Sequence, residues 1–211
     1  MRLKWLGHAS WKIDAGDKTL YIDPYRGRYD EEADLILVTH SHTDHCDPSK
    51  VAMVKGDNTV IVAPADCADK IGSPVKSLKP REKAQFGEIE VEAVEAYNVK
   101  RFRSPGVPFH PKDLGVGYII RAEGKAVYHV GDSDFIPEMK EIEGVDVLLI
   151  PSGGTYTMDN EDAAEAAVAI HPKKAIPMHI WDSDPGEFKS RVESVSGIRV
   201  VILRPGDTHD L

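Results

Sequence analysis

Three histidines and one aspartate fall within six residues of this chain, directly after the apolar run Leu35–Val38. Neutral imidazole and carboxylate groups are the usual nitrogen and oxygen ligands of zinc and similar divalent ions. Alternate residues of an extended segment point the same way, so two histidines separated by one residue can face a single ion. The end of a strand is also a rigid platform for such ligands. We therefore predict a metal centre that includes His40, His42, Asp44 and His45.

Two more metal-capable side chains follow predicted strands later in the chain. Asp132 comes after Lys125–Val130, and His179 comes after Ala175–Met178. Ligands at the ends of separate strands can converge at one edge of a sandwich, which gives a rigid and open site. Each residue also has a purely structural interpretation, Asp132 as a helix cap and His179 as a core histidine.

Several segments resemble those of a known family. His40–His45 matches the His-x-His-x-Asp-His signature of the metallo-β-lactamase superfamily. Leu6–Ser10 and Tyr21–Pro24 are similar to the opening of its branch of ascorbate-phosphate lactonase-like metal-dependent hydrolases. Three later segments resemble the same superfamily: Gly131–Ser133, Pro151–Met158 and Ala175–His179. In order and spacing, these motifs cover nearly the whole chain.

The resemblance implies two divalent ions, with zinc as the first candidate and manganese or iron as alternatives. A water or hydroxide held between two such ions loses its proton near about pH 7 and becomes a strong nucleophile. Asp44 would orient that hydroxide and accept its proton, which makes it the predicted catalytic residue. The implied ligands are His40 and His42 for the first ion, Asp44, His45 and His179 for the second, and Asp132 as the bridge.

The chain departs from the family pattern at the third ligand of the first ion. The family usually has a histidine near the position where this chain has Asn98. An amide oxygen is a weaker ligand than an imidazole. We predict that His110 takes this position, because it lies on the following loop between Pro108 and Pro111, which restrict its backbone. Asn98 itself, or water, is the alternative.

Two further residues are expected beside the ligands. Asp23 resembles the early aspartate of the superfamily, which holds a ligand histidine by a hydrogen bond. His8 is expected to face the substrate or to support a ligand from behind. His129 is expected to point away from Asp132, because of the alternation of side chains along a strand.

The segment from residue 99 to residue 113 is the only basic cluster of an acidic chain. It contains Lys100, Arg101, Arg103 and Lys112, with Asp113 as its single acid. We expect this segment to cover the site, with Arg101 and Arg103 binding the negative charge of a small substrate.

Composition limits the class of protein. The 211 residues form one domain by length, 1–211, and 41% of them are hydrophobic. A net charge of −9 argues against a nucleic-acid partner, and no apolar run approaches the ~18 residues of a membrane span. Two cysteines and the lack of a signal-peptide pattern favour a reducing cytoplasm. The sequence leaves a monomer and a homo-oligomer equally open.

Short strand patterns dominate both halves of the chain. They occur at residues 2–6, 10–14, 18–23, 35–39, 59–63 and 89–93, and again at 116–121, 125–130, 145–150, 175–178 and 198–203. Helices are expected after Asp47, at 64–70, after Asp159 with Asp162 as a capping-box acid, and after Asp184. Two strand-rich halves with helices predict two sheets packed face to face under outer helices, an α/β (α+β) fold. The resemblance implies the same four-layer αββα sandwich.

Three functions are consistent with these patterns. The first is a dinuclear metal-dependent hydrolase that uses a metal-bridging hydroxide on a small anionic ester, lactone or phosphodiester, such as a phosphorylated one. The second is a nuclease of the same fold, which the acidic charge balance disfavours. The third is a non-catalytic metal-binding or ligand-sensing scaffold whose first site is impaired by Asn98. The fold alone does not fix the substrate or the metal.

Overall fold

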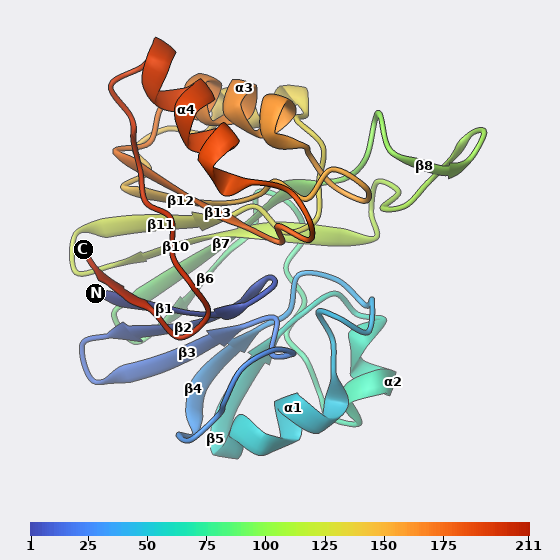
Figure 1. The fold of residues 1–211 in the computed structure, drawn as a ribbon. Helices are drawn as coiled ribbons and strands as arrows, with labels where there is room; N and C mark the ends of the chain where they lie inside the picture. The colour runs from blue at the N-terminus through green and yellow to red at the C-terminus, as the bar shows by residue number, and fades with distance from the viewer.

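Two β-sheets pack face to face, and helices cover both outer faces, in the computed structural model of residues 1–211 (Figure 1). This arrangement confirms the predicted four-layer αββα sandwich. The helices α1 (Pro48–Val54) and α2 (Cys67–Ile71) lie outside the first sheet, and α3 (Asn160–Ile170) and α4 (Pro185–Val195) lie outside the second. None of these helices is long and apolar enough to span a membrane.

The first sheet has six strands, which are β1 (Arg2–Gly7), β2 (Ser10–Ala15), β3 (Lys18–Ile22), β4 (Ala33–Leu37), β5 (Lys55–Val62) and β15 (Thr208–Asp210). Their order is β15-β1-β2-β3-β4-β5. Strands β3, β4 and β5 are parallel, and β2 is antiparallel to β1 and β3. The carboxyl ends of β1, β3 and β4 therefore lie at one edge of the sheet.

The second sheet has seven strands, which are β6 (Lys83–Phe86), β7 (Ile89–Ala96), β10 (Gly115–Ala122), β11 (Lys125–His129), β12 (Val147–Pro151), β13 (Lys174–Met178) and β14 (Arg199–Val200). Their order is β14-β13-β12-β11-β10-β7-β6. Strands β11 to β14 are parallel, and β10 is antiparallel to both β7 and β11. The carboxyl ends of β7, β11 and β13 therefore share an edge.

Two smaller elements complete the fold. The 3-10 helix η1 (Pro137–Glu141) follows β11, and β8 (Phe102–Ser104) pairs with β9 (Val107–Pro108). The β8-β9 hairpin projects from the edge of the sandwich (Figure 1). Its residues belong to the predicted basic segment.

Three apolar clusters hold the four layers together. The largest lies between the sheets and includes Trp11, Leu37 and Tyr118. A second joins the second sheet to α3 and α4 through residues such as Phe188, and a third joins the first sheet to α1 and α2. The continuous apolar runs predicted as buried strands are therefore covered on both faces.

The structure corrects several details of the sequence-based prediction. The last predicted strand, 198–203, is reduced to β14, and the short polar strand β15 and the edge strand β6 were not predicted. Asp159 caps α3 as expected, accepting from the backbone N–H groups of Glu161 and Asp162. Asp162 does not act as a capping-box acid, because its carboxylate instead accepts hydrogen bonds from Lys100 and Arg101.

Candidate metal centre

The candidate ligands gather where strand ends of both sheets meet. His8 follows β1, Asp23 follows β3, and the segment His40–His45 follows β4. From the second sheet, Asp132 follows β11 and His179 follows β13. The two sheets touch here, since the backbone N–H of His179 donates to the carbonyl oxygen of His8 at 3.1 Å. The site therefore depends on the packing of one sheet against the other.

Three histidines form the first group of potential ligands. The ligand-capable nitrogens of His40, His42 and His110 all lie within 4.8 Å of one another. Nε2 of His40 is 3.1 Å from Nδ1 of His42. His40 packs directly over Gly115, where a Cβ atom would lie 2.6 Å from that of His40. The absence of a side chain at Gly115 thus leaves room for the imidazole.

Asn98 holds His110, the member of this group that comes from the loop after β7. Its Oδ1 accepts hydrogen bonds from both the backbone N–H and the Nδ1 of His110, each at 2.8 Å. Its Nδ2 donates to the carbonyl oxygen of Tyr156 at 3.1 Å. With Nδ1 of His110 as donor, Nε2 keeps its lone pair and faces the site. Asn98 therefore orients His110, which lies beside His40 and His42.

Four residues form a second group, which are His8, Asp44, His45 and His179. Nε2 of His8 is 3.1 Å from Oδ2 of Asp44, and the rings of His8 and His179 have centroids 3.9 Å apart. The resemblance implied only three of these side chains as ligands. The structure brings His8 into the same group, whereas the sequence placed it at the substrate or behind a ligand.

Asp132 lies between the two groups. Its Oδ2 is 3.3 Å from Nε2 of His110, 3.4 Å from Nε2 of His45 and 3.2 Å from Nε2 of His179. One carboxylate oxygen therefore approaches histidines of both groups. His129, by contrast, belongs to neither group, since its ring nitrogens bond the carbonyl of Ala9 and the N–H of Gly131.

A buried aspartate fixes the orientation of His45. Oδ2 of Asp23 accepts a hydrogen bond from Nδ1 of His45 at 2.7 Å, and Oδ1 accepts one from the backbone N–H of Thr39 at 2.7 Å. The hydroxyl of Thr39 donates to the same carboxylate. Nε2 of His45 is thereby turned toward Asp132, and the start of the histidine loop is anchored to the end of β3.

The site has the electrostatics of a cation-binding cavity. Burial lowers the pKa of His40 well below its ordinary value and that of His110 to about 4, so both rings are neutral. Burial also opposes ionisation of Asp132, but the neighbouring His179 and His45 outweigh it and hold its pKa well below the usual range. Burial would lower the pKa of His45 as well, yet Asp132 and Asp23 raise it well above normal. The buried carboxylate of Asp132 and the neutral rings of His40 and His110 are donors of the kind that bind divalent cations.

The residues present fit bound divalent ions. Nε2 of His45, both ring nitrogens of His179 and Oδ1 of Asp132 are buried without any hydrogen-bond partner. Such orphaned polar atoms are costly in a protein interior. Ligand atoms about 2.1 Å from one ion in tetrahedral or octahedral geometry lie about 3.0 to 3.4 Å apart, and the distances from Oδ2 of Asp132 to Nε2 of His110, His45 and His179 fall in this range.

Four of the eight non-glycine residues with a positive φ angle lie at the same place. His8, Asp23, His179 and Trp181 all have positive φ angles, of 54°, 45°, 51° and 49°. Non-glycine residues in this region cost about 1–3 kcal/mol each and persist where the surrounding structure imposes them. The sandwich thus holds these side chains in conformations that an isolated loop would avoid.

The basic segment is mostly committed to structural ion pairs, which corrects one prediction. The Arg101 side chain is only 10% exposed and pairs with Asp134, Asp159 and Asp162. Lys100 also pairs with Asp162. The prediction that Arg101 binds substrate is therefore wrong, because its guanidinium is already surrounded by carboxylates. Lys112 likewise pairs with Glu95 and Glu138.

A pocket of about 470 Å³ opens over the candidate ligands. Arg103 lines it, as predicted for a substrate-facing residue, and so does Lys70, which the sequence analysis missed. Lys70 is far from every motif in sequence and comes from the end of α2. Four aromatic side chains also line the pocket and were not predicted: Tyr25, Phe109, Tyr156 and Trp181. Tyr156 lies inside the family-like segment Pro151–Met158, and Trp181 lies two residues after His179. Their closeness to these segments in the sequence could have indicated that they lie near the site.

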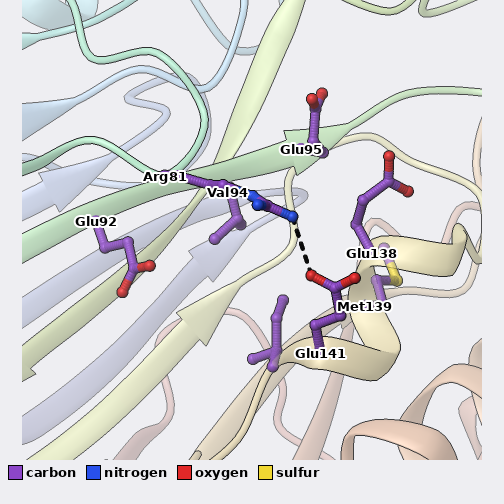
Figure 2. Close-up of a pocket in the computed structure, with 8 residues that line it drawn as sticks. Arg81, Glu92, Val94, Glu95, Glu138, Met139 and Glu141 are labelled. Atoms are coloured by element: carbon purple, nitrogen blue, oxygen red, sulfur yellow. Dashed lines mark hydrogen bonds and ion pairs between the residues drawn. The ribbon is translucent and has the colours of Figure 1, made fainter.

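A second, smaller cavity of about 120 Å³ shares no lining residue with this pocket. Figure 2 shows the ion pair between Arg81 and Glu141, which both line this cavity. Nη2 of Arg81 lies 3.0 Å from Oε2 of Glu141. The lining of the cavity contains no histidine or cysteine, so it does not compete as a metal centre. The remaining lining residues are Glu92, Val94, Glu95, Glu138, Met139 and Ile142.

Comparison with known proteins agrees with the fold and the histidine pattern. A sequence model described as a β-lactamase superfamily domain matches residues 2–179. The chain belongs to the metallo-β-lactamase superfamily. Within it, the chain is 32% identical, over the full length of both proteins, to a protein of Pelotomaculum thermopropionicum named a UPF0173 metal-dependent hydrolase. A protein of the same name from Pyrococcus horikoshii is 34% identical over 98% of each chain.

Solved structures show the same fold over the whole sandwich. A candidate metal-dependent hydrolase of Parabacteroides distasonis superposes with a TM-score of 0.89 and 33% identity, over 97% of this chain and 93% of that one. The metallo hydrolase Igni18 of Ignicoccus hospitalis superposes with a TM-score of 0.81 and 26% identity, over 100% and 98% of the two chains. None of these names specifies the lactonase-like branch, which stays a prediction.

We predict that Asn98→Ala weakens metal binding by about 10–100-fold, because His110 loses the acceptor that fixes its ring. Asn98→Asp keeps an oxygen at this position and should retain most of the affinity. Competition with a chromophoric chelator measures both variants, and Asn58→Ala, at an exposed site on β5, is the matched control. Unchanged affinity in Asn98→Ala would show that His110 is held without Asn98.

We predict that Arg101→Ala lowers the free energy of unfolding by about 3–5 kcal/mol, because the buried Asp134 and Asp162 lose the guanidinium that pairs with both of them. Arg103→Ala, on the exposed β8-β9 hairpin, should change it by no more than about 0.5 kcal/mol. Urea denaturation of both variants makes the comparison. Equal stability of the two variants would contradict the structural role assigned to Arg101.

Proposed function

We propose that this chain is a metal-dependent hydrolase that acts with two divalent ions on a small anionic ester, lactone or phosphoester. One observation carries the proposal. Oδ2 of Asp132 lies 3.2–3.4 Å from histidines of both ligand groups, so a single buried carboxylate lies within reach of both groups. The names of the relatives support metal-dependent hydrolysis in general.

In this proposal His40, His42 and His110 would hold the first ion, Asp44, His45 and His179 would hold the second, and Asp132 would serve both. Zinc fits the nitrogen-rich donor set, and manganese or iron are the alternatives. When bound, the ions would bring the pKa of water near to about 7 and polarise the substrate carbonyl or phosphoryl oxygen.

Asp44 then handles the proton transfers of the hydrolysis. The oxygen of water adds to the carbonyl carbon or phosphorus, and the bond to the leaving oxygen breaks. Asp44 takes the proton that the water loses and passes it to the leaving oxygen, as a general base and then a general acid. Its carboxylate is held by the hydrogen bond with His8 at 3.1 Å and faces the pocket. Asp44 is thus fixed in position before the substrate arrives.

The charge of the pocket supports an anionic substrate. Arg103 and Lys70 both line it, and neither forms an ion pair with a carboxylate of the chain. The scaffold hypothesis rested on an impaired first group at Asn98. The grouping of His110 with His40 and His42 supports a complete first group, and therefore favours the hydrolase over the scaffold.

We predict that the protein binds two divalent ions per chain after reconstitution with zinc or manganese. Elemental analysis of protein dialysed against trace metal measures the ratio. Asp132→Ala removes the shared oxygen and should lower the ratio, whereas Asp57→Ala, exposed at the start of β5, should not. A ratio of one or less for the natural sequence would exclude the two-ion proposal.

We predict that Asp44→Asn lowers the rate of hydrolysis by about 10²–10⁴-fold while the fold stays intact, because asparagine has the same shape but accepts no proton. The substrates are a panel of lactones, phosphodiesters and phosphomonoesters. Asp57→Asn is the matched control for the same change at an exposed position, and circular dichroism checks the fold. Retention of more than about a tenth of the activity would remove Asp44 from the role of base.

A further inference from the structure

A continuous arc of aromatic rings borders the metal centre. The ring of Trp181 lies 5.2 Å from that of His8 and 6.0 Å from that of Tyr156, centroid to centroid. Tyr156 in turn meets Phe109 edge to face at 4.8 Å. On the other side, His8 meets Tyr25 at 5.7 Å. The arc thus runs from the end of β3, past the second ligand group, to the loop that carries His110.

Two rings of this arc are exposed to solvent. Trp181 is 54% exposed and Tyr156 is 39% exposed, whereas Trp5 and Trp11 are buried between the sheets. Trp181 also keeps a left-handed backbone conformation, with a φ angle of 49°. It packs so closely on Gly153 that a Cβ there would lie 2.6 Å from Cδ1 of the indole. The structure therefore holds an exposed indole in a fixed place beside the ligands.

One end of the arc carries positive charge. The guanidinium of Arg103 lies over the ring of Phe109, 5.8 Å from its centroid. Arg103 forms no ion pair, unlike Lys100, Arg101 and Lys112 of the same segment. An unpaired cation beside a row of aromatic rings can bind a negative charge while an attached planar group lies on the rings.

We infer that the substrate of this site joins a negative charge to a planar aromatic or conjugated group, which lies against Trp181 and Tyr156 while the charge faces Arg103. The inference rests on the proposed function, because it names the substrate class of the same pocket. Planar rings pack face to edge and offset on aromatic side chains, which gives them an advantage over small or saturated groups of equal charge. The aromatic rings then select a substrate with a planar group, and Arg103 orients that substrate through its negative charge.

Binding of three phosphonates to the metal-loaded protein tests this inference without any turnover. Phenylphosphonate, cyclohexylphosphonate and methylphosphonate carry the same anionic group and differ only in the attached group. Isothermal titration should show phenylphosphonate binding about tenfold more tightly than methylphosphonate, with cyclohexylphosphonate in between. Equal affinity of the phenyl and methyl compounds, or no binding of any of the three, would overturn the inference. Equal affinity of the phenyl and cyclohexyl compounds would show an apolar wall without a preference for planar rings, which also overturns it.

Variants assign the preference to its residues. Trp181→Ala should abolish the advantage of phenylphosphonate and leave the affinity for methylphosphonate and the metal content unchanged. Tyr156→Ser should reduce the same advantage, which provides a second test if Trp181→Ala does not fold. Arg103→Gln should weaken all three ligands alike, by about threefold to tenfold. Phe102→Ala is the control, because Phe102 is exposed on the same hairpin but does not line the pocket. A Trp181→Ala variant that keeps the phenyl preference would contradict the assignment.

The outcome is separable from that of the proposed function. A phenyl preference in a protein that hydrolyses no ester would leave the aromatic binding site standing and contradict hydrolysis. Hydrolysis of aliphatic and aromatic esters with equal efficiency, together with equal phosphonate affinities, would leave hydrolysis standing and contradict the aromatic site.

Discussion

The negative charge of Asp132, buried where the two sheets meet, is the constraint that organises this molecule. A carboxylate in such a place is tolerated only if opposite charge or strong hydrogen-bond donors surround it. Three histidines from three different segments approach its Oδ2 at 3.2–3.4 Å. Each of these segments leaves a strand end of the sandwich, so the register of both sheets determines whether the charge is satisfied. Correct packing between the sheets is therefore needed to compensate the buried charge of Asp132.

His110 joins His40 and His42 in one group although it lies on the long loop that follows β7. The strand β7 ends at Ala96, and Asn98 follows two residues later. The resemblance to the family implied a histidine near this position. A histidine twelve residues later lies beside His40 and His42, and Asn98 accepts two hydrogen bonds from it. The amide thus remains involved in the site, from behind the imidazole. A neutral acceptor at this place fixes the ring without adding a further buried charge.

Much of this arrangement follows from the sequence, for identifiable reasons. The continuous apolar run before His40 could only be a buried strand, so the ligands that follow it had to lie at a sheet edge. Asp159 and Asp47 were recognisable as helix caps because short polar side chains compete for the backbone at these positions. Arg101 was misassigned because charge alone does not reveal that Asp134, Asp159 and Asp162 approach it from three distant segments. Lys70 and Trp181 were missed because they reach the site through tertiary packing, and no motif at their own positions marks them.

Asp134 has a consequence for how ions enter the site. Its buried carboxylate accepts hydrogen bonds from three consecutive backbone N–H groups, those of Val99, Lys100 and Arg101. The loop that brings His110 to the site is therefore ordered by the protein itself, through a residue that lies two positions after Asp132. In small zinc domains the chain folds only around the metal, so the binding equilibrium contains the whole folding transition. Here the loop that carries His110 loses its conformational entropy when the chain folds. Binding of an ion to this preorganised site should therefore cause little change in heat capacity.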